Sequence, residues 1–108
     1  MNYYVRVETT EKSKAGNKKF FELNISLDDI KKYIIDPYKE SERVYIDNRF
    51  IEYSDILQLS VFQSEKTAEQ LADEVQKTVP DGFLVFYSPI DVINNNYMKN
   101  ITKELIFG

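Results

Sequence analysis

Four lysines gather in one polar stretch near the N-terminus: Lys12, Lys14, Lys18 and Lys19. Together they could hold the phosphates of a nucleic acid or nucleotide, with Tyr3, Tyr4 and Phe20 close enough in sequence to stack on bases. However, the stretch contains no arginine, the residue that binds phosphate through two parallel hydrogen bonds. The alternative is a solvated loop that lysines keep soluble, and the sequence favours this interpretation.

Two pairs of acids have the spacing of an acid–base couple or a site for a hard cation: Asp28 with Asp29, and Glu40 with Glu42. The first pair falls at the expected start of a helix, where the helix dipole attracts negative charge. The second falls in a polar connection. Neither pair has the alternating acids and central glycine of a calcium loop. Both are predicted to be ordinary surface acids.

Several other catalytic chemistries are excluded because the chain lacks the residues that they need. The chain has no histidine and no cysteine, so it lacks imidazole bases, thiol nucleophiles and thiolate metal ligands. Its glycines, Gly16, Gly82 and Gly108, are too far apart for a nucleotide-binding loop. Nothing marks a Ser–Lys dyad. We therefore expect a protein that is not an enzyme and that holds no metal or cofactor. A cryptic enzyme is the last-ranked alternative, for which only a deeply buried lysine or glutamate in a pocket would count.

Aromatic residues are the remaining candidates, because the chain has eight tyrosines and seven phenylalanines. Tyr4, Phe20, Tyr45, Phe50 and Tyr53 could face outward from strands and form a binding surface. The favoured alternative is a sheet covered on both faces, one by each helix, so that these rings form a second core. If a partner binds, the hypothesis places the contact at Tyr45, Asp47, Asn48, Arg49, Phe50 and Tyr53.

The first half of the chain has well-marked elements. Alternating apolar residues predict strands over residues 3–8 and 21–25, joined as a hairpin by a long, mobile loop at residues 11–19. Ser26 then caps a helix whose apolar stripe includes Leu27, Ile30 and Ile34. Pro37 disfavours helical geometry at the residue before it, which predicts that the helix ends at Asp36.

The second half begins with a tight hairpin. Asp47 and Asn48 tolerate the positive φ of a type I′ turn, which would place Val44 opposite Ile51 and Tyr45 opposite Phe50. A strand follows over residues 56–62, and then a helix that starts with a Thr67–Gln70 capping box. Residues 83–87 read as an apolar strand buried on both faces. Tyr97, Ile101 and Leu105 could line a last helix.

These elements predict an α+β fold in the order β-β-α-β-β-β-α-β, with a further helix at the end. Its mostly antiparallel sheet would have five or six strands, in an order compatible with a β-grasp-like arrangement. One domain over residues 1–108 is expected, and the apolar end at Phe107 suggests that it is the N-terminal domain of a longer protein. The N-terminus does not resemble a signal peptide, so the cytoplasm is the predicted location and no membrane contact is expected. The net charge of −4 disfavours nucleic acid as a partner.

Three stretches together resemble a known bacterial domain. They are FFELNIS leading into LDDI and ending at DPY (residues 20–38), VYIDNRFI followed by SDI (residues 44–56), and NITKELI (residues 100–106). In this combination the chain resembles an N-terminal accessory domain of bacterial anti-phage defence proteins, of the kind that precedes TIR-like nucleotide-binding domains. One departure is Asn48, where the hairpin of that domain is expected to carry glycine.

The resemblance implies a non-enzymatic module that senses, docks or oligomerises, while a linked effector domain carries the chemistry. It implies that residues 102–106 form the junction with that effector. It supplies no catalytic residue to carry over. A protein partner or a covalently linked effector is thus expected, and the sequence leaves the oligomeric state open.

Overall fold

The computed structural model describes residues 1–83 and 85–108, and it has the expected α+β architecture. A four-stranded sheet has the order β2-β1-β5-β6, with β1 at Asn2–Ser13, β2 at Gly16–Leu23, β5 at Ile56–Ser64 and β6 at Lys99–Asn100. Its ladders are all antiparallel. A separate two-stranded sheet consists of β3 (Val44–Ile46) and β4 (Arg49–Ile51).

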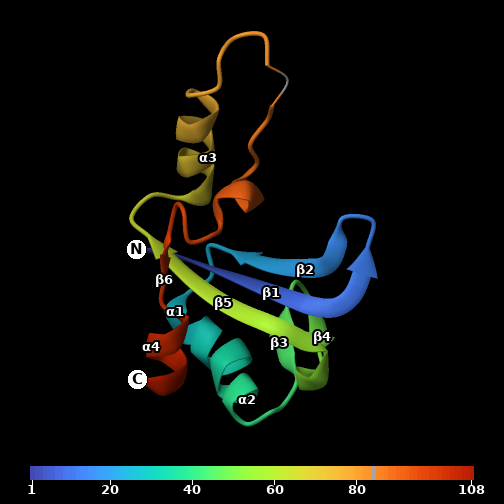
Figure 1. Cartoon of the computed structure of the whole chain (residues 1–108). Coiled ribbons are helices and arrows are strands. Elements are labelled where there is room, and N and C mark those ends of the chain that lie inside the picture. Colours follow the sequence, from blue (N-terminus) through green and yellow to red (C-terminus); the bar gives the residue numbers. More distant parts are fainter. Residues whose placement is uncertain (84) are drawn as a thin grey trace.

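Both faces of the main sheet are covered, as the sequence favoured (Figure 1). Val5 and Val7 of β1 lie in one core, together with residues of the helical segment α1 (Leu27–Ile30), η1 (Lys31–Ile35) and α2 (Asp36–Lys39). Tyr4, on the opposite face of the same strand, lies in a second core under α3 (Ala68–Gln76). The alternation of β1 therefore builds two hydrophobic layers rather than one.

The β1–β2 connection is much tighter than predicted. The two strands pair out to Ser13 opposite Gly16, so Lys12, Lys18 and Lys19 belong to strands and not to a long loop. Gly16 has a φ of 111°, which suits glycine at the turn. The hairpin end extends past the core, where both faces meet solvent, and its residues therefore show no apolar alternation.

The first helical segment continues through Pro37, contrary to the prediction. A π-helical turn at η1, in which the Asp36 N–H donates to the Lys31 carbonyl, widens the helix just before the proline ring. The actual end comes at Ser41, whose φ is 57°. There the N–H of Glu42 donates to the Pro37 carbonyl at 2.8 Å and that of Ser41 to the Tyr38 carbonyl at 3.1 Å, forming a Schellman motif.

The predicted strand at residues 83–87 is also wrong. Phe83 and residues 85–87 belong to no strand, and Val85 and Phe86 are exposed rather than buried; Leu84 lies outside the described residues. The last strand is instead β6, which pairs with β5 at Phe62 and Gln63. A short 3₁₀ turn, η3 (Pro89–Val92), precedes it and packs on α3.

Two other expectations have mixed outcomes. The last helix exists, as α4 (Thr102–Phe107), but Tyr97 precedes it. The β-grasp-like arrangement requires parallel central strands, whereas β1 and β5 are antiparallel, with Thr9 opposite Ile56. The reason is that the β3–β4 hairpin and the 3₁₀ turn η2 (Tyr53–Asp55) return the chain to the end of the sheet where β1 finishes. In the described part of the chain, no helix has the length and apolarity to cross a membrane.

The hydroxyl of Tyr4 links α3 to the loop that follows β2 through two hydrogen bonds. Its buried hydroxyl accepts a hydrogen bond from the N–H of Ala68 at 2.7 Å, at the first residue of α3, and donates one to Oδ1 of Asn24 at 2.8 Å. The capping box of α3 forms as predicted, with Thr67 and Gln70 bonded reciprocally. One phenol thus fixes α3 to the start of β1.

Replacing Tyr4 by Phe should reduce the free energy of unfolding by about 1–3 kcal/mol, since the buried Ala68 N–H loses its acceptor. Urea denaturation measures the change. Tyr97→Phe is the control, because Tyr97 is half exposed and should change stability by about 0.5 kcal/mol or less. Equal effects of the two variants would refute the role given to Tyr4.

The same phenol predicts a pH dependence. Burial raises the pKa of Tyr4, against the lowering effect of the Ala68 hydrogen bond, with Glu69 adding a smaller increase. The unfolded chain therefore ionises Tyr4 first, and folded stability falls as the pH rises above about 10. Tyr4→Phe lacks this loss, so the stability gap between it and the wild type should narrow above that pH.

Candidate functional site

The β3–β4 hairpin has the geometry predicted for it. Asp47 and Asn48 have φ values of 54° and 57°, as a type I′ turn requires, and Tyr45 lies opposite Phe50. Val44, Ile46 and Ile51 point into the first core. The alternation of the strands then leaves Tyr45 and Phe50 on the outer side, where 39% and 59% of their surfaces are exposed.

The outer side of the hairpin continues onto the neighbouring helical segment through a row of rings. The ring centroids of Tyr45 and Phe50 are 5.0 Å apart, and Tyr33 of η1 lies 6.3 Å from Tyr45. These tilted arrangements are favourable for aromatic pairs. We refer to the surface of Tyr33, Tyr45 and Phe50 as the aromatic face.

Two cations lie over the outer rings of this face. The guanidinium of Arg43 is 4.5 Å from the Phe50 centroid, and the ammonium of Lys32 is 5.1 Å from the Tyr33 centroid. Such contacts hold a cation near an aromatic surface without removing its charge. The aromatic face therefore combines apolar area with positive charge at both ends.

The turn is fixed in place by the main sheet. The N–H of Asp47 donates to the Glu22 carboxylate of β2 at 2.8 Å. At the other end of the hairpin, the Tyr53 ring packs against Tyr38 of α2, with centroids 5.3 Å apart. Both ends are thus anchored, so the rings between them are held in a defined arrangement.

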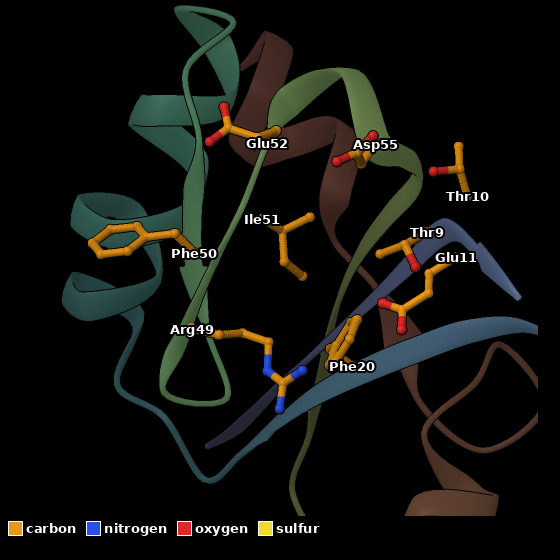
Figure 2. A pocket seen from close by; sticks show the side chains of 9 residues that line it. All are labelled: Thr9, Thr10, Glu11, Phe20, Arg49, Phe50, Ile51, Glu52 and Asp55. Carbon is orange, nitrogen blue, oxygen red and sulfur yellow. The ribbon is translucent and has the colours of Figure 1, made fainter. Parts of the chain in front are cut away.

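Arg49 lies on a different side of the hairpin. Its guanidinium is 4.6 Å from the Phe20 ring and borders a shallow hollow of about 390 Å³. Figure 2 shows Arg49 directed toward Phe20, and Phe50 pointing away from the hollow. The rim also carries Glu11, Glu52 and Asp55. Because charges of both signs surround an open depression, no single ligand chemistry is favoured there.

The structure brings together part of the predicted contact set. Tyr45 and Phe50 share the aromatic face, Asp47 and Asn48 form the turn beside it, and Arg49 and Tyr53 point elsewhere. Of the five rings proposed as outward-facing, Tyr4 and Phe20 are buried, and each belongs to a core. The remaining rings are the exposed ones.

Sequence reasoning missed Tyr33, Lys32 and Arg43. A signal for Tyr33 existed: it is a large aromatic residue that lies off the apolar stripe of Leu27, Ile30 and Ile34, so a helix necessarily turns it away from the core. The two cations had no such signal. Their positions over rings depend on tertiary contacts between the helix and the hairpin.

The four lysines do not form one patch. Side chains alternate along β2, so Lys18 and Lys19 lie on opposite faces. Lys18 pairs with Glu11 at 3.4 Å, Lys12 donates a hydrogen bond to Asn17, and Lys19 lies opposite Glu8 across the ladder. Acids and amides therefore surround most of the positive charge.

Among residues 1–83 and 85–108, no group of three or more Asp or Glu side chains is placed to hold an ion together.

Comparison with protein-family models, curated proteins and solved structures finds no match to this chain. The assignment of function therefore depends on the geometry above and on the resemblance of the sequence.

A titration with single-stranded nucleic acid tests whether the lysines of the β1–β2 hairpin bind phosphates. With its lysines split between two faces, the hairpin should give no saturable binding of single-stranded DNA or RNA at low salt. Fluorescence anisotropy at low and moderate salt measures this. Tight binding with a steep salt dependence, lost in Lys12→Ala/Lys19→Ala, would instead support phosphate recognition.

Proposed function

We propose that this chain is a non-enzymatic interaction domain that docks a protein partner through the aromatic face. The main support for this proposal is the continuous row of exposed rings, which crosses from η1 to the β3–β4 hairpin and consists of Tyr33, Tyr45 and Phe50. Aromatic residues and arginine are enriched at protein interfaces, and they provide most hot spots there.

Preorganisation supports this proposal. The anchored turn and the ring-to-ring contacts hold the side chains before a partner arrives, which lowers the entropy lost on binding. Arg43 and Lys32, at the two ends of the row, favour a partner whose apolar contact surface has acidic residues around it.

On the resemblance of the sequence, we propose that this docking role belongs to a bacterial anti-phage defence protein with its chemistry in a linked effector domain. We propose the cytoplasm as its location. One of the three stretches that carry the resemblance, VYIDNRFI at residues 44–51, contains Tyr45 and Phe50 of the aromatic face. Under this proposal the domain senses or docks, and the effector acts.

Tyr45→Ala/Phe50→Ala should keep the fold and lose the partner. Both rings are exposed, so the double variant should lose about 1–2 kcal/mol of stability, mainly from the ring pair. Circular dichroism and urea denaturation check folding. Binding is measured by site-specific photo-crosslinking in the source cells, with benzoylphenylalanine in place of Glu42, an exposed residue next to Arg43.

The matched control is Leu57→Ala/Tyr97→Ala, which also removes two exposed apolar side chains but lies outside the aromatic face. The wild type and the control should give one discrete adduct, and Tyr45→Ala/Phe50→Ala should give none. Unfolding of that variant would assign both rings to the core. A folded variant with an undiminished adduct would refute docking at this face.

The defence role has its own test. We expect the complete gene, in its native host, to reduce phage plating, and Tyr45→Ala/Phe50→Ala in that gene to abolish the protection. Leu57→Ala/Tyr97→Ala should leave it intact. Equal plating with and without the gene, across a broad phage panel, would refute the defence assignment while leaving the docking result unaffected.

A further inference from the structure

Residues 85–87 lie beside α3, where the Gln76 side chain bonds their backbone and Tyr87 packs against the second core. Gln76, the last residue of α3, donates a hydrogen bond from Nε2 to the Val85 carbonyl at 2.7 Å. The same side chain accepts one at Oε1 from the N–H of Tyr87 at 2.8 Å. Figure 1 shows this part of the chain running back alongside α3.

These two hydrogen bonds have the pattern that an adjacent parallel strand would make. In a parallel ladder, one residue of the adjacent strand bonds the carbonyl before and the N–H after a given residue. The Gln76 amide does this around Phe86. It therefore holds residues 85–87 extended and satisfies one edge of the segment.

The opposite edge is open. In an extended chain the N–H and carbonyl of Phe86 point away from the edge that Gln76 occupies. Within the described part of the chain, no hydrogen bond uses either group. The Phe86 side chain is 81% exposed, and Val85 is exposed beside it.

The composition of this segment suits a strand. Val, Phe and Tyr have high β-propensity, and no charged residue occurs between Gly82 and Ile90. An uncharged, apolar edge of this kind is a template for pairing with another chain. Elsewhere the sequence carries a net charge of −4, so this uncharged segment is one where two copies can meet without charge repulsion between the paired residues.

We propose that residues 85–87 pair antiparallel with the same residues of a second copy of this chain, about a two-fold axis at Phe86. Each Phe86 N–H then donates to the carbonyl of the other Phe86, as in a hydrogen-bonded antiparallel pair. The contact is self-complementary, as an isologous dimer requires.

The structure also limits the assembly to two copies. Gln76 occupies the second edge of the segment, so a third chain has no place to add. Pro89 in η3, two residues after Tyr87, cannot donate a backbone hydrogen bond, which limits pairing beyond the segment on that side. In Figure 1, α3 and the segment beside it lie at the opposite end of the molecule from the β3–β4 hairpin, so dimerisation leaves the aromatic face free.

Sedimentation velocity tests the dimer and the backbone bond together. The wild type should shift from monomer to dimer as its concentration rises. Phe86→Pro removes the N–H that the pairing uses, and it should weaken the dimer at least about tenfold. Phe107→Ala is the control, because Phe107 is 83% exposed at the end of α4 and should leave the dimer unchanged.

Disulfide cross-linking tests the two-fold register separately. Because the chain has no cysteine of its own, a single introduced cysteine can link only to the same position of a second copy. Phe86→Cys should form a disulfide-linked dimer under mild oxidation, since Cα atoms in a hydrogen-bonded antiparallel pair are about 5.5 Å apart. Phe107→Cys should cross-link much more slowly. A wild type that stays monomeric overturns the proposal. So does a dimer that tolerates Phe86→Pro, or one whose Phe86→Cys cross-links no faster than Phe107→Cys.

Discussion

The two-sided strand β1 is the constraint on which the rest of the molecule depends. Val5 and Val7 need cover on one face, and Tyr4 needs it on the other. A chain of 108 residues has little material for two cores, so nearly every element serves one of them. The helical segment and the β3–β4 hairpin cover the first face, and α3 with η3 covers the second.

This division explains which apolar side chains remain outside. The inward side of the hairpin completes the first core, so its outward side is free to carry Tyr45 and Phe50. Similarly, α3 packs its alanines over Tyr4, while its last residue, Gln76, is left to hold residues 85–87. The two exposed surfaces are thus consequences of how the cores are built. We propose that one serves a different protein and the other a second copy.

The sequence predicted elements that local chemistry decides. The Asp47–Asn48 turn, the Thr67–Gln70 capping box and the alternation of β1 each follow from a few adjacent residues. It failed where tertiary structure overrides a local signal. Pro37 lies inside a helix because the π-turn before it accommodates its ring, and a Schellman motif ends the helix only at Ser41. The lysine-rich stretch forms strands because β1 and β2 pair with each other along it. For the candidate site, the tight hairpin was predictable, whereas the stacking of Arg43 and Lys32 was not.

We propose that the aromatic face is a contact surface, whereas Tyr4 belongs to the core. Hydroxyl-radical footprinting, read residue by residue by mass spectrometry, tests both parts in one measurement. In the purified chain we predict rapid oxidation of Tyr45 and Phe50 and protection of Tyr4. In the native assembly, Tyr45 and Phe50 should become protected as well. Oxidation of Tyr4 at the rate of Tyr45, or undiminished oxidation of Tyr45 and Phe50 in the assembly, would contradict the claim.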